Sequence, residues 1–164
     1  MGVSTDAIVV YGYVCDEEER PWDVEGGADW DEVLDAKVDA QPEVVGFGSD
    51  PWDTTPGQDD RAVFKAWLRE TYAERMALYA KRAAIAERLK HGCDIDWHCS
   101  DGCPMPYVYI VGSRVVASRG DPVELKSLEV GADWDERLKA FVAEFGMTPP
   151  SDAGPRWWLM SWWG

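Results

Sequence analysis

The stretch WWLMSWW at residues 157–163 constrains the fold more than any other part of the sequence. Side chains of an extended strand alternate between its two faces, so Trp157 and Leu159 would face one way and Trp158 and Met160 the other. Large apolar residues on both faces are typical of a strand inside a sheet whose faces are covered. The sequence therefore predicts a buried C-terminal strand, with only its last tryptophans partly exposed.

Four further strands are predicted upstream. Residues 6–14, DAIVVYGYV, form a β-branched and aromatic run that predicts a buried central strand. Residues 93–100 alternate between polar and apolar side chains and predict a third strand. Residues 106–118 predict two more strands, and Gly112 with Ser113 between them is typical of a hairpin turn.

Three helices are predicted between these strands. Residues 61–90 hold no proline or glycine, and Gly92 follows as a stop signal, so they predict one long helix. Residues 27–38 and 131–146 predict two shorter helices. Both begin with the sequence GADWDE, in which the first aspartate would cap the helix and the tryptophan would pack back over the turn. The apolar stripe of the long helix consists of Phe64, Leu68, Tyr72, Met76, Tyr79, Ala83 and Ala86.

These elements predict an α/β fold. A chain of 164 residues is long enough for one domain with a sizeable core, so we expect residues 1–164 to form a single domain. Its sheet would be mixed, with about five strands and the two terminal strands in central positions. One long helix and two shorter ones would cover it.

The net charge of −15 is the strongest signal in the composition. Most of the acidic excess lies in residues 1–60, where Arg20 and Lys37 are the only basic residues. Generic nucleic-acid binding is disfavoured, because phosphate contacts need a basic surface. A partner protein with a basic surface is favoured by the same field. The sequence has no secretion signal and no apolar run of membrane-spanning length, so we expect neither export nor membrane insertion.

Residues 93–103, CDIDWHCSDGC, hold the only dense group of residues that could bind a metal. A zinc site would need Cys93, His98, Cys99 and Cys103 to converge. Neighbouring strand residues point to opposite faces, which separates His98 from Cys99 and also argues against a Cys–His nucleophile pair. We therefore expect no bound metal, no cofactor and no catalytic residue, although Cys99 with His91, or Cys15 with His98, could still meet in space.

Candidate binding residues come from two acidic segments and one strand. The acidic residues after the first strand would lie at its exposed end. The loop 46–60 is long for a compact domain, and such loops are often functional, although Trp52 could instead fill the core. The candidate binding residues are Glu17, Glu18, Glu19, Asp50, Trp52, Asp53, Asp59, Asp60, His98 and Cys99.

Three segments resemble a family of small acidic proteins encoded by phages of actinobacteria. They are STDAIVVYGY at 4–13, HCS at 98–100 followed by Pro104 and Met105, and WWLMSWWG at 157–164. The resemblance implies a phage origin and a location in the host cytoplasm. It implies no activity and no catalytic residue.

For function, we expect a non-enzymatic phage accessory protein that binds and inhibits or modulates a host or defence component. The sequence has no nucleophile-elbow or phosphate-loop motif, which favours binding over catalysis. One alternative is a small-molecule binder or enzyme that uses the 46–60 loop and the His98–Cys99 strand edge. Another is a structural or assembly factor that forms homo-oligomers through the helix 61–90. A deep pocket lined by His98, Cys99 and Trp52 would favour the first alternative.

Overall fold

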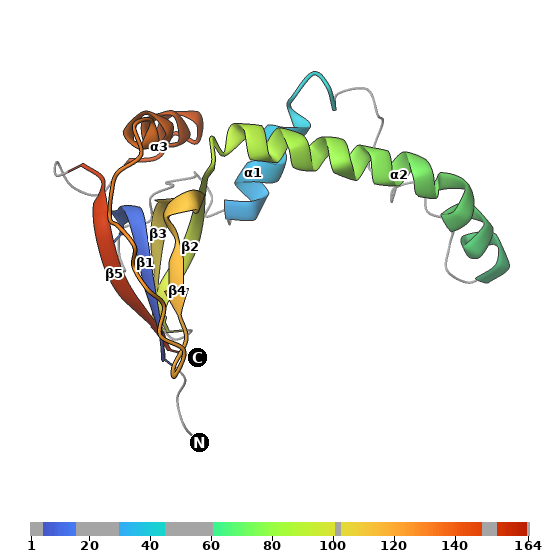
Figure 1. The fold of residues 1–164 in the computed structure, drawn as a ribbon. Helices are drawn as coiled ribbons and strands as arrows, with labels where there is room; N and C mark the ends of the chain where they lie inside the picture. Colours follow the sequence, from blue (N-terminus) through green and yellow to red (C-terminus); the bar gives the residue numbers. More distant parts are fainter. Residues whose placement is uncertain (1–4, 16–29, 45–60, 101–102, 149–153, 164) are drawn as a thin grey trace. The chain divides into compact units, whose positions relative to one another are not determined.

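The computed structural model describes residues 5–15, 30–44, 61–100, 103–148 and 154–163 (Figure 1). These residues form a five-stranded mixed sheet with one long and two shorter helices, which confirms the predicted α/β class. The strands are β1 (Thr5–Val14), β2 (Cys93–Ser100), β3 (Cys103–Ile110), β4 (Val115–Ala117) and β5 (Arg156–Trp163); the helices are α1 (Trp30–Asp39), α2 (Arg61–Leu89) and α3 (Trp134–Glu144).

The chain divides into two compact units. One unit spans residues 31–88 and contains most of α1 and α2. The other contains residues 1–30 and 89–164, and therefore the whole sheet and α3. That residues 1–164 act as one domain stays a prediction.

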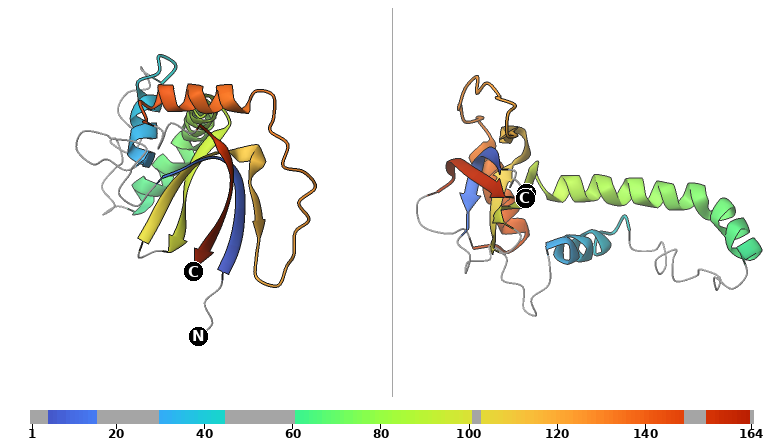
Figure 2. Two further views of the ribbon diagram at one scale, coloured as in Figure 1. Left: turned by 90° about the vertical axis from the view of Figure 1, so that its left-hand side faces the viewer. Right: turned by 90° about the horizontal axis from the view of Figure 1, so that it is seen from below.

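The two terminal strands lie in the middle of the sheet, as predicted. The strand order is β3-β2-β5-β1-β4 (Figure 2). β5 pairs antiparallel with β1 along its whole length, from Thr5 opposite Trp163 to Gly12 opposite Arg156. The other edge of β5 pairs with β2 in parallel, at Cys99 opposite Trp162. The Trp-rich segment is therefore paired along its length on one edge but only at its last two residues on the other. The prediction that only its last tryptophans are partly exposed is wrong, because Leu159 is 75% exposed and, of its described side chains, only that of Met160 is buried.

The predicted hairpin at Gly112 and Ser113 is wrong. β3 and β4 both pair antiparallel with β1, so they run in the same direction along one edge of it. A short 3₁₀ turn (Val111–Ser113) separates them and leaves a gap in the ladder. Ser113 fills that gap: its hydroxyl accepts a hydrogen bond from the backbone N–H of Tyr11 (2.8 Å) and donates one to the carbonyl of Ile110 (2.7 Å). The residues that signal a turn form a bulge instead.

Gly12 lies where β1 passes closest to β3. A Cβ atom added at this position would lie 1.9 Å from the carbonyl oxygen of Val108 and 2.8 Å from the Cα of Tyr109. Only glycine allows two backbones to approach this closely inside a strand. Gly12 therefore makes the β1–β3 pairing possible.

One face of the sheet, which we call the helix face, packs against α3. Leu138 and Phe141 of α3 are fully buried. The ring of Trp134 lies 5.6 Å from the ring of Tyr11, tilted to it, and 5.8 Å from the ring of Trp157 in an edge-to-face arrangement. Burial and a hydrogen bond that Tyr11 donates to Asp135 (2.8 Å) raise the pKa of Tyr11 to about 12.

The ends of α3 agree only in part with the prediction. Gly146 follows the helix with a φ of +61°, as expected for a stop. The indole of Trp134 does pack over the turn, because a Cβ added at Gly131 would lie 2.3 Å from its Nε1. Asp133 occupies the N-cap position, but its side chain makes no capping hydrogen bond and instead pairs with Arg137 at 3.9 Å. The predicted capping role of Asp133 is therefore wrong.

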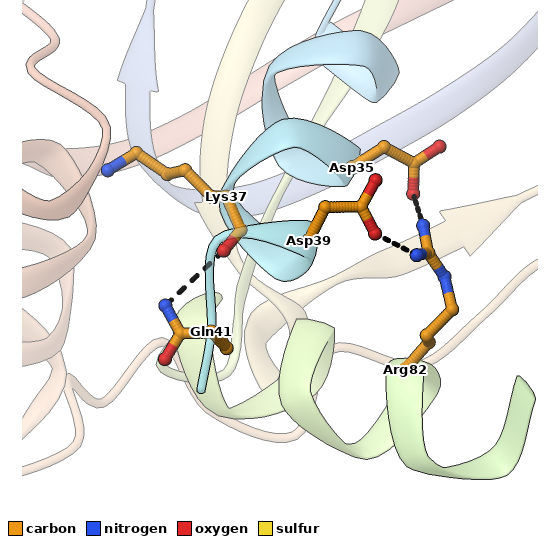
Figure 3. Close-up of polar contacts among 5 residues, drawn as sticks. All are labelled: Asp35, Lys37, Asp39, Gln41 and Arg82. Carbon is orange, nitrogen blue, oxygen red and sulfur yellow. Dashed lines mark hydrogen bonds and ion pairs between the residues drawn. The ribbon is translucent and has the colours of Figure 1, made fainter. Parts of the chain in front are cut away.

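Within the unit of residues 31–88, polar contacts join α1 to α2. Figure 3 shows Asp35 and Asp39, one turn apart on α1, both reaching the guanidinium of Arg82. Arg82 donates to Asp35 at 3.2 Å and also to Asp39. Part of the basic charge of the long helix is thus compensated inside the unit.

The buried positions of α2 differ from the predicted stripe. Tyr72, Met76 and Tyr79 are exposed, at 59%, 47% and 43%. Leu78 and Ile85 are buried instead. The helix itself is confirmed, but the stripe that revealed it is not its buried side.

Candidate functional site

Of the ten candidate binding residues, the structure describes only His98 and Cys99. Both lie on β2, and both are partly exposed. The other eight lie outside the described residues: Glu17, Glu18, Glu19, Asp50, Trp52, Asp53, Asp59 and Asp60. The prediction that they bind a partner therefore stays a prediction.

The second face of the sheet, opposite the side chains that meet α3, carries a pocket, and we call it the pocket face. Its apolar floor is a cluster of Ile8, Val10, Tyr107, Tyr109 and Met160. Next to this cluster lies a pocket of about 170 Å³. Its lining residues come from β1, β2, β4, β5 and the residue before β4: Asp6, Ile8, Asp96, Trp97, Arg114, Val116 and Trp162.

Asp96 is the hydrogen-bonded carboxylate of this pocket. Its Oδ2 accepts hydrogen bonds from the hydroxyl of Tyr107 (3.0 Å) and from the guanidinium of Arg114 (3.3 Å). Its Oδ1 accepts the backbone N–H of Trp97 (2.8 Å). Burial raises the pKa of Tyr107, which keeps the hydroxyl protonated and able to donate. Asp96 therefore has a partner on each of its oxygens.

Asp6, the other carboxylate of the pocket, differs from Asp96 in how its oxygens are paired. Its Oδ1 atom is shielded from solvent and has no hydrogen-bond partner among the described residues. Leaving such an acceptor unpaired costs about 1–3 kcal/mol, and more where the group is charged. Groups with this cost are typical of sites that wait for a ligand, an ion or an ordered water.

His98 lies near the pocket but does not line it. Its ring is 6.0 Å from the ring of Tyr107, and its Nε2 has no hydrogen-bond partner among the described residues. Burial lowers the pKa of His98. Cys99, the next residue, has a φ of +83°, a strained value for a residue with a side chain. Trp52 lies outside the described residues, so a pocket lined by His98, Cys99 and Trp52 stays a prediction; in the pocket described above, β2 contributes Asp96 and Trp97.

Two of the cysteines in the described part of the chain are buried. Cys93 is fully buried, and burial raises its pKa to about 12, so its thiol stays protonated. Cys15 is also buried. Across the described ranges, no group of three or more His, Cys, Asp or Glu side chains could hold a metal ion, while the side chain of Cys103 lies outside what is described.

Two signals in the sequence could have indicated this pocket. Asp94 and Asp96 occupy alternate positions of β2, which places both carboxylates on one face of a strand. Asp6 begins an apolar strand and shares a face with Ile8 and Val10. A charged residue on an otherwise apolar strand face is a candidate for a buried site.

Comparison with known proteins gave no match. No protein-family model, no curated protein and no solved structure is similar to this chain at a significant level. Among the described helices, none combines the length and the apolar character that crossing a membrane requires.

Proposed function

We propose that this protein acts by binding rather than by catalysis, as a phage accessory protein that inhibits or modulates a host or defence component with a basic surface. The observation that carries the proposal is the shielded Asp6 oxygen, which lacks a partner in a pocket shared with two tryptophans. A cationic group on a partner would supply the missing donor and balance the charge. The net charge of −15 would steer a basic partner towards the protein.

The phage origin and the location in the host cytoplasm belong to the same proposal. They rest on the resemblance of three segments, STDAIVVYGY, HCS and WWLMSWWG, to small acidic proteins of actinobacteriophages. If the protein modulates a host component, a basic partner fits the net charge of −15 of this chain.

A capture experiment from actinobacterial lysate at low and physiological salt tests this function. The wild type should retain a basic protein, and the captured amount should fall steeply as salt rises, because exposed charges are screened beyond about 10 Å at 0.1 M salt. Asp6→Asn should weaken capture strongly, while Asp121→Asn, which removes an exposed charge outside the pocket, should not. Capture that is indifferent to salt and to Asp6→Asn would contradict the proposal.

The acidic segment after β1 is tested in the same assay. Replacing Glu17, Glu18 and Glu19 together with glutamine should slow association without lowering the melting temperature, because rim charges act mainly on the association rate. An unchanged association rate would show that this segment serves solubility only.

A second candidate is a small-molecule binder, or an enzyme, that uses the same side of the molecule. The pocket of about 170 Å³ favours it, because this volume suits a small ligand. The 46–60 loop and the His98–Cys99 strand edge would then shape access to the ligand. Specific retention of a small molecule, with no protein captured, would favour this candidate.

A third candidate is a homo-oligomer formed through α2. Tyr72, Met76 and Tyr79 are exposed and follow the i, i+4, i+7 spacing of one helix face. If this face joins two copies, Met76→Lys should convert the oligomer to a monomer in light-scattering measurements. A wild type that is already monomeric would exclude this candidate.

A further inference from the structure

The size of the pocket limits what it can receive. Its volume of about 170 Å³ is close to that of an engineered cavity of about 150 Å³ that accepts benzene. A planar group of a few heavy atoms with part of its alkyl stem would fit, whereas a folded peptide segment would not. The pocket therefore suits one side chain of a partner.

The formal charges of the pocket favour a monovalent cation. Two carboxylates, Asp6 and Asp96, face one guanidinium, that of Arg114. Arg114 donates to Asp96 (3.3 Å), and no contact of Arg114 with Asp6 is found in the described part of the chain. One negative charge is left over, at the carboxylate whose Oδ1 is shielded from solvent.

The aromatic wall favours a planar cation over a compact one. Trp162 lies opposite Asp6 in the β1–β5 pairing and packs beside the apolar cluster, so its indole can form a wall of this pocket; Trp97 lines it next to its backbone N–H, which bonds to Asp96. A guanidinium stacks on an indole face and donates two parallel hydrogen bonds to a carboxylate. It is also more weakly hydrated than an ammonium group, so its transfer out of water costs less.

We propose that this pocket is a guanidinium site that takes the side chain of an arginine from the partner, with Asp6 as its carboxylate and Trp162 as its aromatic wall. The inference rests on the proposed function, because it names the group by which the basic partner is recognised. The pocket already contains one pair of this kind, because the guanidinium of Arg114 pairs with the carboxylate of Asp96. The incoming arginine would complete a second pair beside the first.

The test uses the full-length protein and three small probes. N-acetyl-arginine-N-methylamide is titrated in ¹⁵N NMR spectra, in which the indole signals of Trp97 and Trp162 are assigned through Trp97→Phe and Trp162→Phe. The matching lysine and citrulline compounds serve as comparison probes. Citrulline keeps the shape of arginine but carries no charge.

The arginine probe should shift the indole signal of Trp162 saturably, and the indole signal of Trp97, on the other face of β2, should shift less. The citrulline probe should bind at least about tenfold more weakly, as should the arginine probe with Asp6→Asn, because a hydrogen bond to a charged group contributes about 1.5–3 kcal/mol. Asp121→Asn should bind the arginine probe like the wild type. The lysine probe should bind more weakly than the arginine probe.

Three results would overturn the inference. They are equal binding of the lysine and arginine probes, unchanged binding after Asp6→Asn, and no saturable shift at about 50 mM arginine probe, well above a millimolar Kd. If these occur while lysate capture still depends on salt and on Asp6, only the guanidinium assignment fails. If the arginine probe binds but capture is indifferent to salt and to Asp6, the proposed function fails instead.

Discussion

On the helix face of the sheet, the hydroxyl of Tyr11 donates to Asp135 at 2.8 Å, and the side chains of Leu138 and Phe141 have no exposed surface. On the pocket face, Asp6 keeps a shielded oxygen without a partner among the described residues, beside a pocket of about 170 Å³. The helix face has one exception, the Nε1 of Trp157, but an unpaired neutral N–H costs less than an unpaired carboxylate. Both faces hold fully buried side chains, such as Phe141 on the helix face and Tyr107 on the pocket face, so the difference lies in how their polar groups are paired and not in how tightly they pack.

The test with the largest expected loss of stability removes β5, whose side chains lie on both faces of the sheet. Truncation after Pro155 deletes β5, which contributes Trp157 to the helix face and Trp158, Met160 and Trp162 to the pocket face. Met160 is buried and the three tryptophans are partly buried, and their loss comes together with loss of the longest strand partner of β1. Since a large buried side chain alone is worth about 3–5 kcal/mol when cut to alanine, the combined loss is comparable to the stability of a typical domain. We expect insoluble protein or no cooperative melting by circular dichroism. A soluble truncated chain that melts cooperatively would show that neither face depends on β5.

A second test isolates the helix face. Phe141→Ala should lower the free energy of unfolding by about 3–5 kcal/mol, because its ring is fully buried against Trp30 and Phe145. Leu159→Ala is the matched control, since that side chain is 75% exposed and should change stability by less than about 0.5 kcal/mol. Urea titration measures both. Similar losses in the two variants would show that burial against α3 does not set the contribution of these side chains.

A third test concerns the gap between β3 and β4. Ser113→Ala removes the hydroxyl that satisfies the N–H of Tyr11, and it should cost about 1–3 kcal/mol. Ser118→Ala, at an exposed position beyond β4, is the control. Amide hydrogen exchange at Tyr11 should become faster in Ser113→Ala. If stability and exchange both stay as in the wild type, the bulge is not held by this side chain.

A fourth test compares one polar group on each face. Tyr11→Phe should lower stability by about 0.5–1.5 kcal/mol, because it removes a satisfied hydrogen bond. Asp6→Asn should leave the melting temperature unchanged or raise it, because it removes a charge that the fold does not compensate. Differential scanning calorimetry measures both variants. A large destabilisation by Asp6→Asn would make Asp6 a structural residue and contradict its role as a binding residue.

The smallest expected effect is a pH dependence at His98. Burial lowers its pKa below the ordinary value of about 6.5, so the unfolded chain takes up the proton first as the pH falls. The stability that neutral His98 contributes is present above about pH 6.5 and is lost as the pH falls through the pKa of the folded state. The stability difference between wild type and His98→Gln should therefore be constant above pH 7 and move against the wild type below pH 6.5. A difference that is equal at pH 8 and pH 5.5 would contradict this account.

Local patterns predicted the strands and helices well, because the spacing of apolar residues within each segment indicates whether that segment is a strand or a helix. The bounds of β2 match the predicted residues 93–100, and α2 begins at Arg61 as predicted. The hairpin failed because Gly112 and Ser113 suit a bulge as well as a turn, and only the distant partner β1 decides between them. The stripe on α2 failed because alanines and tyrosines spread apolar surface around most of this helix.

The pocket was harder to predict than the fold. Its residues come from four strands that are far apart in the chain, and none of them forms a local motif. Their side chains meet only because β1 pairs with β5 on one edge and with β4 on the other. The alternation of Asp94 and Asp96 was visible in the sequence, but the position of Asp6 beside them depends on the strand order.

The pairing of β1 with β5 also governs when the protein can fold during synthesis. Thr5 lies opposite Trp163, so the first strand made by the ribosome must wait for the last one. The apolar β1 segment is therefore left without its longest partner until residues 156–163 have been synthesised, and long-range pairings of this kind form slowly. A nascent chain stalled before residue 156 would expose an unpaired apolar edge, which is a site for chaperone binding or aggregation. We expect this sheet to assemble only after β5 has left the ribosome.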